Sequence, residues 1–128
     1  KYLYSNLTTL VLNTYPFARE GSIKKSLRYT GKLIDKGWNI IIFPEGGRSQ
    51  SGEMKPFKTG IGLITEEMKT DIIPIKIQGN YEIMPKGKVL PKPGKVQVKI
   101  GKKIPYHELR GKSYLEITKI LEKRVREL

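Results

Sequence analysis

The sequence contains no cysteine and a single histidine, His107, among its 128 residues. Disulfide bonds and thiolate metal sites are therefore excluded within this chain. One imidazole also leaves too few nitrogen ligands for a usual zinc site. We expect no metal and no bound cofactor, and the lack of cysteine fits a reducing compartment.

Long hydrophobic runs are missing as well. No apolar stretch approaches the roughly 18 residues that a membrane-spanning helix needs. The first residues do not form a signal peptide either. The chain opens without methionine and in the middle of a pattern, so we expect residues of the same fold upstream of Lys1.

Acidic residues are scarce: 12 of them face 25 lysines and arginines, which gives a formal net charge of +13. Such an excess predicts an anionic partner, either a nucleic acid, a phospholipid surface or a phosphorylated small molecule. Charge alone does not choose among these. The length is enough for one domain over residues 1–128 and too short for two.

Apolar spacing predicts helices over residues 3–15, 23–34, 57–68 and 113–128, with Ser22 as an N-cap and Gly37 as the end of the second. Strands are predicted over residues 40–43, 72–77 and 95–100, and a loop over residues 80–93. The apolar run at residues 40–43 predicts a buried strand. The alternation of polar and apolar residues in 95–100 predicts a strand with one buried face and one face exposed to solvent. Helices alternating with strands indicate an α/β fold with a mixed, largely parallel sheet flanked by helices.

Charged residues follow the strand predicted over residues 40–43. Glu45 and Arg48 stand three apart on a glycine-bearing turn, where open α/β sheets bind their ligands. Glu45 could accept from hydroxyls while Arg48 pairs with a phosphate. The alternative is a surface ion pair between the two that fixes the turn. Gly46 and Gly47 either let a ligand approach the backbone or supply a positive φ.

Lys58 lies at the predicted start of the helix over residues 57–68. A helix N-terminus with an added lysine attracts anions, so Lys58 is a candidate phosphate contact. A lysine that is simply solvated is the alternative.

Three short blocks carry a resemblance to a known family. They read P-F-A-R at residues 16–19, F-P-E-G-G-R-S at 43–49 with P-F-K-T-G at 56–60, and I-I-P-I at 72–75. In this order and at these spacings they resemble blocks II to IV of the PlsC-type lysophosphatidic acid acyltransferases. The resemblance covers almost the whole chain.

The resemblance implies an O-acyltransferase of phospholipid synthesis or remodelling, peripheral on the cytoplasmic face of the membrane. An acyl group would pass from acyl-CoA or acyl carrier protein, as co-substrate, to a hydroxyl of a lysophospholipid or glycerol phosphate. It implies that Arg19, Glu45 and Arg48 bind the acceptor, with Gly46, Gly47 and Ser49 in the same block and Lys58 as a phosphate contact.

The first block of that family, H-x4-D, is absent from this sequence. It supplies the general base, and here the only histidine, His107, is followed by Lys112 where the aspartate would stand. We expect His107 at the surface and the catalytic His and Asp upstream, so that the chain is the C-terminal part of the domain and inactive alone. The alternative is a non-catalytic module that binds lipid or phosphate.

Seven lysines and no acid lie between Met84 and Lys103. They form either a solvated basic face or a patch for anionic lipid headgroups or the phosphates of coenzyme A. No aromatic residue stands between Tyr81 and Tyr106, whereas nucleic-acid surfaces interleave aromatic and basic residues. We therefore expect an anionic membrane surface and no nucleic acid as partner. The lysines of this run are Lys86, Lys88, Lys92, Lys95, Lys99, Lys102 and Lys103.

Overall fold

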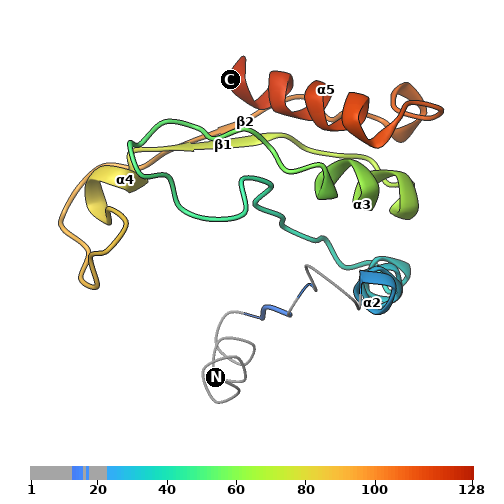
Figure 1. The fold of residues 1–128 in the computed structure, drawn as a ribbon, viewed down its shortest axis with the longest axis horizontal. Helices are drawn as coiled ribbons and strands as arrows, with labels where there is room; N and C mark the ends of the chain where they lie inside the picture. The colour runs from blue at the N-terminus through green and yellow to red at the C-terminus, as the bar shows by residue number, and fades with distance from the viewer. Residues whose placement is uncertain (1–12, 16, 18–22) are drawn as a thin grey trace. The chain divides into compact units, whose positions relative to one another are not determined.

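The structure, a computed structural model, describes residues 13–15, 17 and 23–128. The chain divides into two compact units, Lys1–Ile40 and Ile41–Leu128. Figure 1 shows the chain as a ribbon. The helix predicted over residues 3–15 lies mostly outside the described residues, and its last three residues are not helical. Ser22 also lies outside them.

The first unit contains helix α2, Ile23–Asp35. Its buried side is polar: the Thr30 hydroxyl donates to the Ser26 carbonyl at 2.9 Å and lies 2.7 Å from the Tyr15 hydroxyl. The rings of Tyr15 and Tyr29 meet edge to face with centroids 5.0 Å apart. Thr30, which follows Ile23 and Leu27 at helical spacing, is thus held by hydrogen bonds.

Helix α2 ends where the sequence predicts. Gly37 has a φ of +81° and its N–H donates to Ile34 at 2.8 Å, while the N–H of Trp38 donates to Leu33 at 3.0 Å. These two bonds form a Schellman motif, which favours glycine because of the positive φ. The prediction of Gly37 as the helix end is confirmed.

The second unit packs two helices beside a two-stranded sheet (Figure 1). Buried aliphatic residues form its core, and partly buried neighbours pack on them. The core residues are Ile104, Leu109, Ile117 and Leu121. The elements are α3 (Gly60–Met68), β1 (Ile75–Gln78), α4 (Asn80–Ile83), β2 (Gln97–Ile100), the short 3-10 helix η1 (Tyr106–Glu108) and α5 (Tyr114–Arg126).

Strands β1 and β2 pair antiparallel, with Ile75 opposite Ile100 and Ile77 opposite Val98. An isolated antiparallel bridge between Ile72 and Ile104 continues the pairing toward the core. The two strands predicted over residues 72–77 and 95–100 are confirmed with shorter bounds, and Pro74 precedes β1 as expected of a strand end. The described residues contain no parallel pair of strands. After β1 the chain turns back, so that β2 runs beside β1 in the opposite direction, whereas a parallel neighbour would need a crossover connection.

The predicted strand over residues 40–43 is not formed. Ile41 and Phe43 are 77% and 70% exposed, and no described segment pairs with this run. The prediction of a buried strand was wrong here because a strand needs a hydrogen-bonded neighbour, which a local pattern does not specify.

The burial of β2 also differs from the prediction. Its aliphatic face is exposed, with Val98 at 55% and Ile100 at 69%, while Lys99 on the opposite face is half-buried. Helix α5 lies beside the lysine face: Lys76 donates through Nζ to the Arg126 carbonyl at 2.9 Å and Lys99 donates to that of Leu128. Lysine is favoured there because the last carbonyls of a helix lack intrahelical partners.

The one-turn helix α4 lies where the sequence predicts a loop. Four residues are too few to show a helical period, so no pattern could have found it. Helix α5 begins close to its predicted position, with Ser113 as N-cap in a capping box with Glu116. The hydrogen bonds from Ser113 lower the pKa of Glu116.

Candidate functional site

The candidate site is the segment from Phe43 to Thr59, which we call the motif loop. It opens with a tight turn in which the Gly46 N–H donates to the Phe43 carbonyl at 3.1 Å, with a φ of +70° at Gly46. Its two ends are joined by the Lys58 N–H, which donates to the Pro44 carbonyl at 2.9 Å. The two halves of the sequence motif, residues 43–49 and 56–60, therefore form one structural unit.

The side chain of Lys58 lies across Gly46. A Cβ added to Gly46 would stand 2.6 Å from Cε of Lys58 and 2.9 Å from its Cδ. Gly46 is thus required twice, by its positive φ and by this close approach. Lys58 precedes α3, whose N-cap is Thr59, so the predicted position in the first helical turn was wrong by a residue or two.

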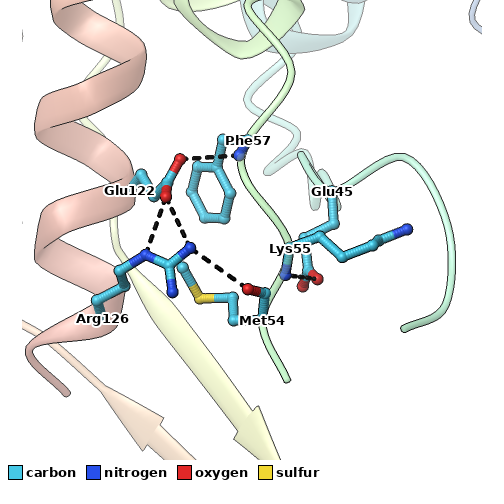
Figure 2. Close-up of polar contacts among 6 residues, drawn as sticks. All are labelled: Glu45, Met54, Lys55, Phe57, Glu122 and Arg126. Atoms are coloured by element: carbon cyan, nitrogen blue, oxygen red, sulfur yellow. Dashed lines mark hydrogen bonds and ion pairs between the residues drawn. The ribbon is translucent and has the colours of Figure 1, made fainter. Parts of the chain in front are cut away.

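Glu45 holds the two sides of the motif loop together. Its half-buried carboxylate accepts from the backbone N–H of Lys55 through Oε2 at 2.8 Å, as Figure 2 shows. Among the described residues no ion pair joins Glu45 to Arg48, so the alternative of a mutual ion pair does not hold. The other carboxylate oxygen, Oε1, has no partner within that part of the chain.

Three cationic side chains belong to this loop. The guanidinium of Arg48 is exposed and has no partner among the described residues, while its carbonyl accepts from Lys55 Nζ at 3.3 Å. That ammonium lies 3.8 Å from the position of a Cβ on Gly47. The aliphatic part of Lys58 thus lies over Gly46 and the ammonium of Lys55 lies near Gly47, on a backbone turn that Arg48 directly follows.

Ser49 stabilises the far part of the loop. Its Oγ accepts from the Ser51 N–H at 3.2 Å, the hydrogen bond of a serine turn. The Tyr81 hydroxyl of α4 donates to the Gln50 carbonyl at 2.8 Å, and its ring packs beside Gly52, which has a φ of +85°. These contacts give Ser49 a structural role, and a further role in binding stays a prediction.

Two residues of α5 that sequence reasoning missed hold the motif loop from the other side (Figure 2). Glu122 accepts from the Phe57 N–H through Oε2 at 2.8 Å and from Nε of Arg126 through Oε1 at 2.9 Å. Arg126 also donates through Nη2 to the Met54 carbonyl at 3.3 Å. The backbone bond from Phe57, followed by the bond from Arg126, lowers the pKa of Glu122.

The sequence carried a weak signal for this pair. Glu122 and Arg126 stand four apart, which is typical of an ion pair on a helix surface. Charged residues of an amphipathic helix usually face solvent, but the Glu122 side chain is only 22% exposed. The backbone N–H of Phe57 that Glu122 accepts from lies 65 residues away in the sequence. Helical spacing cannot predict a contact at that separation.

Two other positions were predicted from the sequence. Arg19 lies outside the described residues. His107 lies in η1 and is exposed, as predicted. It lines an open pocket with Glu66, Tyr106 and Arg110, and no residue of the motif loop lines that pocket.

The described residues hold no group of three or more His, Asp or Glu that could bind a metal ion. Nor does that part of the chain contain a helix long and apolar enough to cross a bilayer.

The profile of the Acyltransferase family matches residues 5–78 of this chain. A 1-acyl-sn-glycerol-3-phosphate acyltransferase of Bacillus subtilis is 32% identical over 123 residues, which cover 91% of this chain and 58% of that protein. A chloroplastic 1-acyl-sn-glycerol-3-phosphate acyltransferase of Brassica napus is 39% identical over 56 residues, which cover 44% of this chain and 16% of that protein.

The fold matches a solved structure, the 1-acyl-sn-glycerophosphate acyltransferase PlsC of Thermotoga maritima. The TM-score is 0.72 and the identity 31%, over 81% of this chain and 44% of the other. This match confirms the expected α/β fold. The chain spans less than two thirds of the length of each of these relatives.

Proposed function

Because this chain belongs to the acyltransferase family, of the PlsC type, we propose that the complete protein acylates a hydroxyl of a lysophospholipid or glycerol phosphate. The relatives from Bacillus subtilis and Brassica napus are named for 1-acyl-sn-glycerol-3-phosphate, which makes that lysophospholipid the first acceptor to test. The acyl donor would be acyl-CoA or acyl carrier protein. The enzyme would work as a peripheral protein on the cytoplasmic face of the membrane.

In the proposed reaction the acceptor hydroxyl oxygen attacks the carbonyl carbon of the acyl thioester. The hydroxyl proton passes to a general base, the carbon–sulfur bond breaks, and the base returns the proton to the leaving thiolate, so that the free thiol is released. We propose that this base is the histidine of an H-x4-D block upstream of Lys1, since residues 1–128 contain no such pair.

The observation that carries the proposal is the cationic turn of the motif loop. The Arg48 guanidinium is exposed and has no partner among the described residues, and the side chain of Lys58 lies over Gly46, two residues before Arg48. A guanidinium can bind two phosphate oxygens at once and a nearby ammonium adds charge, so this turn suits the phosphate of the acceptor. Glu45 keeps Oε1 for an acceptor hydroxyl while Oε2 fixes the loop.

Arg48→Ala in the complete polypeptide tests this role. We expect acyl transfer to 1-acylglycerol-3-phosphate to fall at least about 100-fold, because a charge-assisted bidentate contact of roughly 3 kcal/mol is lost. Arg124→Ala is the matched control, since Arg124 is an exposed arginine of α5 outside the motif loop. Circular dichroism should show an unchanged fold in both variants.

Turnover in Arg48→Ala equal to that of the wild type would contradict the phosphate role. An intact polypeptide that binds the acceptor but transfers no acyl group would favour the non-catalytic binding module instead.

A further inference from the structure

The segment between α4 and β2, residues 84–96, projects from the sheet; we call it the lysine loop. Figure 1 shows it extending beyond α4 at one end of the β1–β2 pair. Its base is closed by the Lys92 N–H, which donates to the Ile83 carbonyl at 2.8 Å. Gly94 packs so closely on Ile83 that an added Cβ would lie 2.6 Å from Cγ1. The base is therefore fixed by Ile83, and residues 85–91 form the tip.

The tip itself has a defined turn. Gly87 has a φ of +94° and the Lys88 N–H donates to the Pro85 carbonyl at 3.1 Å. Pro85 and Pro91 restrict the backbone on either side. The tip is thus a turn with a defined backbone conformation.

Two aliphatic side chains stand at this tip. Val89 is 84% exposed and Leu90 is 80% exposed, the highest values among the large hydrophobic residues that the structure describes. Adjacent apolar side chains on a projecting turn are exposed to water, which is unfavourable unless a bilayer or a binding partner covers them.

The same loop carries four exposed lysines, and none has an ion-pair or hydrogen-bond partner for its ammonium in the described part of the chain. No acid occurs between Glu82 and Glu108. The structure separates these lysines from others of the same run, since Lys99 binds the end of α5 and Lys103 pairs with Asp71 at 2.8 Å. The four are Lys86, Lys88, Lys92 and Lys95.

We propose that the lysine loop docks on an anionic lipid bilayer, with Val89 and Leu90 entering the headgroup layer and the four lysines binding lipid phosphates. Positive charge around an apolar tip complements a surface that is anionic outside and apolar beneath. A nucleic acid offers no apolar layer for aliphatic side chains, and stacking aromatic residues are absent here. The inference rests on the proposed function only in that a lipid acceptor must be taken from a membrane.

Vesicle binding by the complete polypeptide tests the electrostatic part. The vesicles contain phosphatidylcholine with about a third phosphatidylglycerol, or phosphatidylcholine alone. Each lysine near an anionic surface contributes about a fivefold gain in affinity, so neutralising three should weaken binding to the anionic vesicles about 100-fold and flatten its salt dependence. The test variant is K86Q/K88Q/K92Q, and the control is K24Q/K112Q/K119Q, which removes equal charge from exposed positions outside the loop.

Equal weakening by the two triple variants would overturn the loop as the docking surface, because it would show that only total charge matters. Unchanged binding in K86Q/K88Q/K92Q would overturn it as well.

Insertion of the tip is tested separately with a fluorescent label. The chain has no cysteine, so Leu90→Cys is a unique site within these residues for an environment-sensitive nitrobenzoxadiazole probe. We expect the emission at position 90 to rise and shift to the blue on anionic vesicles. Leu115→Cys is the control, a leucine of α5 that is 51% exposed and outside the loop. An unchanged spectrum at position 90 on vesicles that bind the protein would overturn insertion.

Turnover distinguishes this inference from the proposed function. With 1-acylglycerol-3-phosphate in detergent micelles, K86Q/K88Q/K92Q should retain wild-type acyl transfer, because the motif loop is intact. If the wild type shows no turnover there, the proposed function fails, while the vesicle and probe experiments still decide the docking surface.

Discussion

Gly46 meets two requirements of the motif loop, a positive φ and room for the side chain of Lys58. Its φ is +70°, and Cε of Lys58 would lie 2.6 Å from an added Cβ. Gly46→Ala should cost about 1 kcal/mol of stability through backbone strain and should displace Lys58. We therefore expect both a lower urea midpoint and a higher KM for the phosphorylated acceptor in the complete polypeptide.

Gly111→Ala separates the two effects. Gly111 has a φ of +80°, but nothing lies within 4 Å of an added Cβ. It should lose similar stability and keep the wild-type KM. A raised KM in Gly111→Ala would mean that strain alone, without Lys58, explains the effect of Gly46→Ala.

The contribution of Glu122 to the stability of the fold should depend on pH. Its pKa is lowered in the folded state from an ordinary value of 4.5, mainly by the Phe57 N–H. A lowered carboxyl pKa stabilises the fold above the unfolded pKa, and this contribution is lost as pH falls through the folded pKa. Glu122→Gln should thus lose roughly 1 kcal/mol at pH 7, and its deficit should shrink below pH 4.5. Urea unfolding at pH 7 and pH 3 measures this difference.

Glu127→Gln is the control for Glu122→Gln. Glu127 makes only an exposed ion pair of 3.8 Å with Lys123. Its removal should change stability by less than about 0.5 kcal/mol at either pH. A deficit of Glu122→Gln that stays constant from pH 7 to pH 3 would contradict the charge-dependent role.

At the scale of elements, α3 and α5 approach each other through Gly62. A Cβ there would stand 2.0 Å from the Tyr114 carbonyl oxygen and 2.7 Å from Oγ1 of Thr118. Gly62→Ala should therefore force the helices apart and cost roughly 1–3 kcal/mol, the range expected for overpacking. Thermal unfolding of the complete polypeptide measures it.

Gly60→Ala, at the start of the same helix, is the matched control. Nothing lies within 4 Å of an added Cβ at Gly60. Alanine has the higher helix propensity, so this substitution should be neutral or stabilise by up to about 1 kcal/mol. If both substitutions destabilised equally, the close helix contact would not be the cause.

Helices were predicted better than strands, for a physical reason. A helix closes its hydrogen bonds within its own segment, so apolar spacing, Gly37 and Ser113 sufficed to place α2 and α5 within a few residues. A strand depends on a neighbour distant in the sequence. The alternation in β2 was read correctly as a strand, but its lysine face, not its aliphatic face, lies beside α5.

The site divides in the same way. The residues of the motif were singled out from the sequence, but their contacts were not: the side chain of Lys58 lies across Gly46, and Glu45 accepts from the backbone N–H of Lys55. The contribution of Glu122 was not found, because a carboxylate on a helix surface has no local sign of the backbone N–H it accepts from. The binding roles of all the predicted site residues stay predictions, namely those of Arg19, Glu45, Gly46, Gly47, Arg48, Ser49 and Lys58.

At the scale of the molecule, an aliphatic sheet face remains open to solvent in residues 41–128. It comprises five residues that are 42–69% exposed, namely Ile73, Ile75, Ile77, Val98 and Ile100. Contiguous apolar surface of this kind binds hydrophobic dyes and favours association. We expect residues 1–128, expressed alone, to enhance the fluorescence of anilinonaphthalene sulfonate.

Val98→Asp on this face should reduce the dye signal, since it places a charge at the centre of the patch. Gln97→Asp, on the opposite side of the same strand, is the control and should leave the signal unchanged. Equal signals in the two variants would show that the dye binds elsewhere.

The bond from the Phe57 N–H to Glu122 has a consequence for biosynthesis. After incorporating Phe57, the ribosome must add 65 further residues before the chain contains the Glu122 carboxylate that accepts from this N–H. The nascent motif loop therefore lacks this bond until α5 has emerged, and a premature stop codon before Glu122 would remove it altogether.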